Sequence, residues 1–244
     1  MPRTRPLNGA PLQLSDAWRV LARYTTSVRH NGLHGTLENF AALLDDIWFD
    51  WLYGIETARI VNLRDLNVRS DNKHLGVNYV PTRVRAFRKL MAWLNLPVGR
   101  VFVDFGCGKG RVLCAAADYP FRRIVGVEFA TELCNVCRSN VHTYQKRIRS
   151  RTPVSVVEAD AVDYRFTDDE DVLFFFNPFH PAVMQRVLQN IHASLASRQR
   201  TILLIVSNPA NLEPMLDADA VLSKVTEYTY GSSRFIIYSN DVFW

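Results

Sequence analysis

The stretch VFVDFGCGKGRV, residues 101–112, determines how the rest of the chain is interpreted. Its first three residues, 101–103, have the β-branched and aromatic character of a buried strand, and Gly106 ends that run. From Val112 onward, apolar residues and the alanines at 115–117 predict a helix packed against a sheet. The stretch therefore predicts a strand, a tight turn and a helix, in which the turn amides and the helix N-terminus can face a ligand.

The turn contains glycine at every second position, at Gly106, Gly108 and Gly110. Glycine is used where φ is positive or where a ligand lies against the main chain, so three alternating glycines behind a strand indicate a ligand site. A dinucleotide site has the spacing G-x-G-x-x-G, but Arg111 stands where its third glycine would be. Asp104, two residues before the turn, is poorly suited to a pyrophosphate and well suited to a ligand that carries positive charge.

The pattern Asp104-x-Gly106-x-Gly108-x-Gly110 resembles the first motif of class I S-adenosylmethionine-dependent methyltransferases. The resemblance implies S-adenosylmethionine as the cofactor, with Asp104 near its methionine end and the glycines letting it cross the strand tip. It favours methyl transfer over a nicotinamide-dependent oxidoreductase.

Composition and cysteine usage limit the class of protein. The chain has 244 residues, 48% of them hydrophobic, and a net charge of +5, which fits one α/β domain with an appendage and permits an anionic partner. No apolar run reaches the length of a membrane span, so we expect no membrane partner. The cysteines, at 107, 114, 134 and 137, have no second pair of metal ligands nearby, and we interpret them as buried thiols in a reducing, cytoplasmic setting, with no metal site.

From residue 100 onward, strand and helix patterns alternate. After the first strand, further strands are expected to end at Glu128, Asp160, Asn177 and Ser207, with helices over 130–147 and 181–196 and a final hairpin turning at 231–233. This order predicts a doubly wound, mostly parallel sheet with a terminal antiparallel hairpin. It resembles the seven-strand methyltransferase fold over residues 97–244.

Residues 1–96 are expected to form a basic arm and a helical cap or lid. A helix is predicted over 36–61, with a buried apolar stripe at Leu37, Phe40, Leu44, Ile47, Trp51 and Ile55. Three carboxylates lie off that stripe, at Asp45, Asp46 and Asp50. The aromatic residues Trp48, Phe49, Trp51 and Tyr53 either pack the cap or line a substrate pocket. A second helix is predicted from Pro81 to about Asn95, with Val84, Phe87, Met91 and Leu94 inward.

Polar residues stand where the predicted parallel strands end, which is where ligands bind in open α/β sheets. Glu128 can accept both ribose hydroxyls, which is also the role that the resembled family gives it. Asp160 can accept from the adenine amino group while the Ala161 amide reaches a ring nitrogen, and Asp163 is the alternative to Asp160.

Two further motifs carry a resemblance. Asn177-Pro178-Phe179 resembles the N-P-P-[YF] motif of amino-group methyltransferases, with Phe179 in place of the second proline. Its Asn177 side chain and Pro178 carbonyl would hold the N–H groups of a nucleophilic nitrogen, and Phe179 would wall in its carrier. His180 is expected as a helix cap, with a proton-acceptor role as the alternative. NYVPT resembles a stretch of small lysine methyltransferases that folds over the cofactor, which implies cofactor contacts for Tyr79 and Thr82.

The leading functional hypothesis is therefore methylation of a nitrogen on a protein lysine, an N-terminus or a small amine. The alternatives are nucleobase methylation and a non-catalytic subunit that binds a partner. A nucleic-acid partner would use a basic track at Arg138, Lys146, Arg147, Arg149 and Arg151. The sequence leaves the acceptor and the oligomeric state open.

Overall fold

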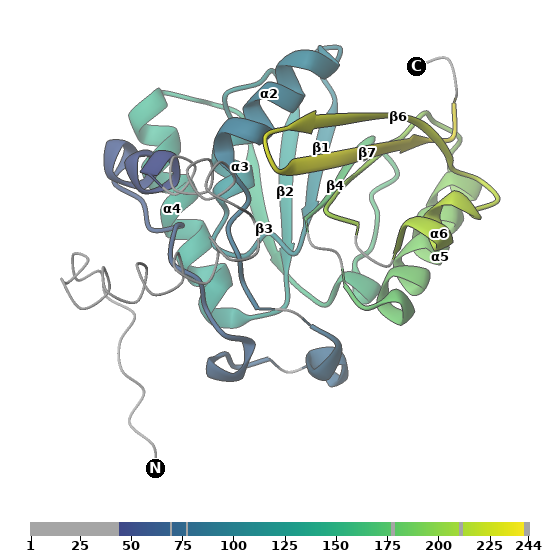
Figure 1. Cartoon of the computed structure of the whole chain (residues 1–244), viewed down its shortest axis with the longest axis horizontal. Coiled ribbons are helices and arrows are strands. Elements are labelled where there is room, and N and C mark those ends of the chain that lie inside the picture. Colours follow the sequence, from purple (N-terminus) through teal and green to yellow (C-terminus); the bar gives the residue numbers. More distant parts are fainter. Residues whose placement is uncertain (1–43, 69, 77, 177–178, 210–211, 242–244) are drawn as a thin grey trace.

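A single seven-stranded sheet organises the computed structural model, which describes residues 44–68, 70–76, 78–176, 179–209 and 212–241 (Figure 1). The strand order is β3-β2-β1-β4-β5-β7-β6. The strands are β1 (Val101–Phe105), β2 (Arg123–Glu128), β3 (Val154–Glu158), β4 (Val172–Phe176), β5 (Leu203–Ser207), β6 (Ser223–Tyr230) and β7 (Ser233–Ser239). β1 to β5 are parallel and β7 is antiparallel to both its neighbours, which confirms the predicted fold class.

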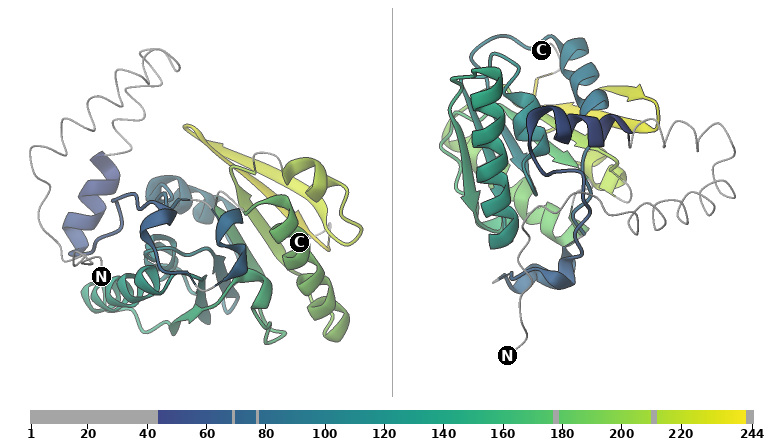
Figure 2. Two further views of the ribbon diagram at one scale, coloured as in Figure 1. Left: turned by 90° about the horizontal axis from the view of Figure 1, so that it is seen from below. Right: turned by 90° about the vertical axis from the view of Figure 1, so that its left-hand side faces the viewer.

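Helices cover both faces of the sheet. One core forms between the sheet and α2 (Val84–Leu94), α3 (Arg111–Ala116) and α4 (Thr131–Ile148), and it contains Phe102 of β1. The other forms beneath α5 (Pro181–Ser197) and α6 (Glu213–Asp217), and it contains the next residue, Val103. Strands buried on both faces explain why β1, β4 and β5 are almost continuously apolar in sequence. Figure 2 shows these two groups of helices on opposite sides of the sheet.

The predicted strands, the terminal hairpin and the helices α4 and α5 are confirmed to within a few residues. α2 begins at Val84 and not at Pro81, because Arg83 keeps an extended conformation as its N-cap. Its four predicted inward residues are all buried. The division of the chain at 96/97 stays a prediction, and α2 shares its core with the sheet.

The helix predicted over 36–61 is too long at its C-terminal end. Helical structure covers residues 44–53, and the predicted residues before 44 lie outside the described part. The helix ends because Gly54 adopts a left-handed conformation with φ +69°. Beyond it, the Asp50 carboxylate accepts hydrogen bonds from the amides of Thr57 (2.5 Å) and Ala58 (2.6 Å), which holds the chain in a turn.

The predicted buried stripe is confirmed at Ile55, which is buried, and is wrong at Leu44 and Trp51. Leu44 and Trp51 are 50% and 71% exposed, whereas Asp46 is buried. The reason is Arg111, whose side chain is buried and has Asp46 and Asp50 as carboxylate partners. A buried guanidinium needs paired carboxylates, so the acidic residues turn inward.

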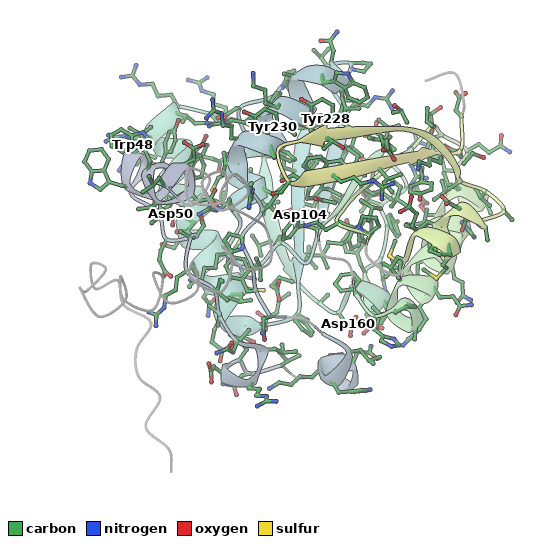
Figure 3. All side chains as sticks on the ribbon, in the orientation of Figure 1. Trp48, Asp50, Asp104, Asp160, Tyr228 and Tyr230 are labelled. Atoms are coloured by element: carbon green, nitrogen blue, oxygen red, sulfur yellow. The ribbon has the colours of Figure 1, made fainter. Side chains whose placement is uncertain are left out.

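The aromatic residues of this helix divide between two environments. Phe49 and Tyr53 pack against Tyr144 of α4, so this half of the cluster packs as expected. Trp48 and Trp51 contact each other with tilted rings, their centroids 4.8 Å apart, and remain exposed. Trp48 points away from the body of the molecule (Figure 3). None of the four lines the cleft described below.

No helix in the described ranges is both long enough and apolar enough to cross a membrane.

Candidate functional site

The three glycines of the 106–110 turn all have positive φ, as the sequence predicts: +81° at Gly106, +53° at Gly108 and +81° at Gly110. The turn is fixed to β2 because the amides of Gly106 and Cys107 both donate to the Val127 carbonyl, at 2.8 and 3.1 Å. A left-handed conformation is strained for residues that carry a Cβ, so the backbone of this turn favours glycine at all three positions.

The glycines differ in what lies against them. A Cβ at Gly108 would lie 2.3 Å from the Tyr79 ring, and one at Gly110 would lie 2.5 Å from the Cys137 sulfur. A Cβ at Gly106 would have ordinary contact with the Phe179 ring, at 3.5 Å, and Gly106 lines the cleft. Two of the three glycines therefore serve the protein's own packing, and Gly106 is the one that faces the ligand space.

A cleft lies at the carboxyl ends of the parallel strands, with about 820 Å³ of empty space including its open mouth. The cleft brings together six of the predicted residues: Tyr79, Gly106, Glu128, Asp160, Ala161 and Phe179. Thr82, Asp104, Gly108 and Gly110 are not among the described residues that line it, and Asn177 and Pro178 lie outside the described residues.

Asp104 is buried at the end of β1, next to the cleft-lining residues Phe105 and Gly106. Within the described part of the chain, its carboxylate has no hydrogen bond and no cation as partner. Burial, and to a smaller extent the neighbouring Glu128 carboxylate, raises the pKa of Asp104 well above its usual value. A buried carboxylate without a partner is costly, so this position favours a cationic ligand group.

Glu128 is held by the backbone around it. One oxygen accepts from the Gly108 amide at 2.9 Å, and the other accepts from the amides of Phe129 and Ala130, each at 3.0 Å. Burial nevertheless raises the pKa of Glu128 to about 7. A carboxylate has about four acceptor positions, so three amides leave room for a further donor such as a ribose hydroxyl. If Glu128 is to bind both ribose hydroxyls, one of its three hydrogen bonds from backbone amides has to break.

Asp160, and not its alternative Asp163, is the acid at the cleft. Asp160 lines the cleft and accepts from the Val162 amide at 3.1 Å, which caps the 3₁₀ helix Ala161–Asp163. Asp163 is exposed. The turn after β3 decides which of the two aspartates reaches the cleft, because Asp160 still lies at the strand ends and Asp163 lies beyond them.

The described residues of 61–79 form a segment that crosses the strand ends and closes one side of the cleft. Its two short 3₁₀ helices, Leu63–Asp65 and Asp71–Leu75, lie below the lower ends of the strands in Figure 1. Asp160 lies close by in Figure 3 and accepts from the Ser70 hydroxyl and from the side-chain NH₂ of Asn72, the latter at 2.8 Å.

Further contacts hold the same segment. The Asn67 amide donates to both oxygens of Glu132 on α4, at 3.1 Å. These contacts, and those of Ser70 and Asn72 with Asp160, were missed in the sequence, because isolated polar residues in an irregular segment give no periodic signal. Ser70 and Asn72 of this segment therefore bind the same Asp160 carboxylate that is predicted from the sequence to accept from the adenine amino group.

Phe179 is the described residue of the Asn-Pro-Phe motif, and its ring lies against Gly106 and edge-on to Phe175. His180 is the N-cap of α5, because its Nδ1 accepts from the Ala182 amide at 3.3 Å. That contact confirms the predicted capping role and engages the ring nitrogen that faces the helix.

The described residues fit S-adenosylmethionine. The unpartnered Asp104 suits its cationic methionine end, Gly106 leaves the strand tip open, and Glu128 and Asp160 follow at the ends of the next two strands outward. The profile of the family described as "Methyltransferase domain" matches residues 102–198, from β1 to just after α5. Residues 102–198 therefore carry a methyltransferase domain, and together with the seven-strand sheet this match supports the class I S-adenosylmethionine-dependent methyltransferase superfamily. S-adenosylmethionine is the cofactor of that superfamily.

Individual relatives of this methyltransferase are distant. A protein-lysine N-methyltransferase of Saccharolobus islandicus (strain REY15A) is 32% identical over 66 residues, which are 27% of this chain and 41% of that protein. The matched region is thus less than half of the curated relative's length.

Among solved structures, magnesium protoporphyrin IX methyltransferase from Synechocystis PCC 6803 has a TM-score of 0.50 at 14% identity, covering 65% of this chain and 79% of that one. An RNA methyltransferase from Salinibacter ruber has a TM-score of 0.48 at 16% identity, covering 66% and 93%. At these identities the likeness concerns the fold alone.

Proposed function

We propose that the protein transfers the methyl group of S-adenosylmethionine to a nitrogen atom of a protein lysine, an N-terminus or a small amine. The observation that carries this proposal is the contact between the Phe179 ring and Gly106, a Cβ at which would lie 3.5 Å from that ring. It places Phe179, the described residue of the Asn-Pro-Phe motif, beside the glycine turn. The relative from Saccharolobus islandicus, a protein-lysine N-methyltransferase, supports the nitrogen assignment.

The cofactor contacts that we propose follow the strand ends. Asp104 pairs with the cationic methionine end, Glu128 accepts from the ribose hydroxyls, and Asp160 with the Ala161 amide binds the adenine edge. Tyr79 and Thr82 belong to the segment that covers the cofactor. Of these two, Tyr79 lines the cleft, and Thr82 is buried at the base of α2.

When bound, S-adenosylmethionine supplies an electrophilic methyl group. The protein's own contribution is then to orient the acceptor: the Asn177 side-chain carbonyl and the Pro178 carbonyl accept N–H hydrogen bonds so that the nitrogen lone pair points into the cleft. Phe179 excludes water from that approach. Positioning of this kind accounts for large accelerations without acid–base catalysis.

Nucleobase methylation receives less support, because the predicted basic track leads away from the cleft. Helix α4 begins at Thr131, close to the end of β2, and rises about 1.5 Å per residue. Lys146 is fifteen residues further along, roughly 22 Å from that end, and Arg147, Arg149 and Arg151 follow it. A strand bound along this track would not lead into the cleft.

We also propose a cytoplasmic location, because all four cysteines are buried free thiols.

The experiment that tests the function has two stages. Calorimetry with S-adenosylmethionine and S-adenosylhomocysteine measures cofactor binding, and a lack of saturable binding of either would overturn the proposal. Transfer of labelled methyl from the cofactor into cell extract, with mass spectrometry of the product, then identifies the bond. A methyl ester or a thioether product would exclude a nitrogen acceptor.

The acceptor motif gives a specific prediction. Asn177→Ala should lower turnover by roughly a hundredfold or more and leave cofactor affinity nearly unchanged, since the lost group orients the acceptor. Asn240→Ala is the matched control: Asn240 accepts from the Ile202 amide and donates to the Arg200 carbonyl at the opposite edge of the sheet. Full activity of the Asn177 variant would contradict the assigned role.

A further inference from the structure

Lys109 in the glycine turn and Arg111, the first residue of α3, are both 2% exposed, and neither lines the cleft. They contact the segment 46–58, which comes more than 50 residues earlier in the chain. Nothing in the first methyltransferase motif requires cations at these positions. Their partners therefore indicate a second function of the turn.

Arg111 has three partners in that segment. Its Nη1 lies 2.5 Å from Asp46 Oδ1 and its Nη2 lies 3.2 Å from Asp50 Oδ1, while its Nε donates to the Thr57 hydroxyl at 2.7 Å. The Thr57 hydroxyl in turn donates to Asp50 at 2.5 Å. Thr57 is fully buried, so these bonds fix the backbone of residue 57 relative to the glycine turn.

Tyr79 is attached to that same backbone. Its hydroxyl donates to the Thr57 carbonyl at 2.7 Å, its ring lies against Gly108, and the Lys109 ammonium lies 5.6 Å from the ring centroid. Lys109 is itself paired with Glu56, and Asn140 of α4 links the Glu56 and Lys109 carbonyls. The Tyr79 ring thus has a fixed place between the turn and the cleft that it lines.

We propose that Arg111 and Thr57 are positioning residues for cofactor binding, and that they act through Tyr79. Arg111 holds the 46–58 segment in place through its bonds to that segment. The Thr57 carbonyl then accepts the hydrogen bond of the Tyr79 hydroxyl, and the Tyr79 ring, fixed in this way, forms the wall of the cleft beside the glycine turn. The inference rests on the proposed function, because it assumes that S-adenosylmethionine binds in this cleft. It makes the helix 44–53 and the chain that follows it part of the cofactor site.

The test compares variants of the full chain by calorimetric titration with S-adenosylhomocysteine, at a temperature where each is fully folded. Tyr79→Phe keeps the ring and removes the hydroxyl, and it should raise the Kd about five- to tenfold, the scale of one lost hydrogen bond. Thr57→Val should raise the Kd at least as much, and Thr57→Ser should restore it.

The matched control is Tyr238→Phe. The Tyr238 hydroxyl donates to Asp217 at 2.9 Å, at the opposite edge of the sheet, so its loss should lower the melting temperature and leave the Kd unchanged. In steady-state kinetics, Tyr79→Phe should raise KM for the cofactor more than it lowers kcat.

Two outcomes overturn the inference and remain distinguishable. If the wild type binds S-adenosylhomocysteine and both Tyr79→Phe and Thr57→Val bind it with the wild-type Kd, Tyr79 is not positioned for binding and the inference fails while the proposed function stands. If the wild type binds neither cofactor form, the proposed function fails and the inference fails with it. If Thr57→Val does not fold, Tyr79→Phe alone decides.

Discussion

Glu128 imposes a cost on the folded protein that can be removed by one substitution. Its carboxyl is buried, and its pKa is raised from 4.5 to about 7. Between these values the folded state binds a proton that the unfolded state does not. The free energy of unfolding therefore falls as pH rises through this window and levels off above it.

The size of this decline follows from the shift. A difference of about 2.5 pKa units, at 1.36 kcal/mol per unit, corresponds to about 3 kcal/mol between pH 4 and pH 8. Asp104 adds to the decline in the same direction, because burial, and to a smaller extent the nearby Glu128 charge, raises its pKa.

Glu128→Gln removes the titrating group and keeps the shape. The glutamine oxygen can keep the amides of Phe129 and Ala130, but its NH₂ group cannot accept from the Gly108 amide, which costs about 1 kcal/mol. The variant should be less stable than wild type by about 1 kcal/mol at pH 4 and more stable by about 2 kcal/mol at pH 8. Its cofactor affinity should fall at both pH values, since the ribose loses an acceptor.

Urea denaturation of both proteins at pH 4, 5, 6, 7 and 8 measures the difference in unfolding free energy at each pH. The change of sign is the result that matters, because other titrating groups, such as Asp46, are present in both proteins. Parallel stability curves for the two proteins would refute the assignment of a proton to Glu128.

Asp104→Asn should raise the unfolding free energy at pH 8, because it removes an unpartnered buried charge, and should weaken S-adenosylmethionine binding roughly 10- to 100-fold, the scale of a charged hydrogen bond. S-adenosylhomocysteine keeps the ammonium group of the methionine end, so it should lose affinity too, and wild-type Kd values for both ligands in calorimetry would argue against a contact with the cationic end. Asp160→Ala should raise the cofactor Kd roughly 5- to 100-fold and increase proteolysis within 61–79, since Ser70 and Asn72 lose their acceptor. Asp163→Ala, three residues away and exposed, is the control, and normal binding by Asp160→Ala with weakened binding by Asp163→Ala would reverse their roles.

Much of the fold could be predicted because it follows from patterns between near neighbours. Strands and helices alternate from Val101 onward, and the runs of apolar residues mark strands that are buried on both faces. The glycine turn was equally accessible, since positive φ is a local property that selects glycine at Gly106, Gly108 and Gly110. The acids at Glu128 and Asp160 were found for the same reason: strands in one parallel sheet end at one edge.

The tertiary structure alone decided what each of these residues touches. The sequence could not show that Arg111 draws Asp46, 65 residues away, into the interior, and so the burial of the helix 44–53 was predicted on the wrong face. The one available signal was the spacing of Asp46 and Asp50, four residues apart and hence on one helix face. Nor could the sequence show that Asn72 binds Asp160, 88 residues away. It also could not show that the space beside Gly108, which a side chain would fill, is taken by the Tyr79 ring and not by a ligand. Periodicity in the sequence shows which side of a helix or strand is apolar. A charged side chain is buried only where a partner of opposite charge offsets the cost of removing it from water, and folding alone brings such a partner near.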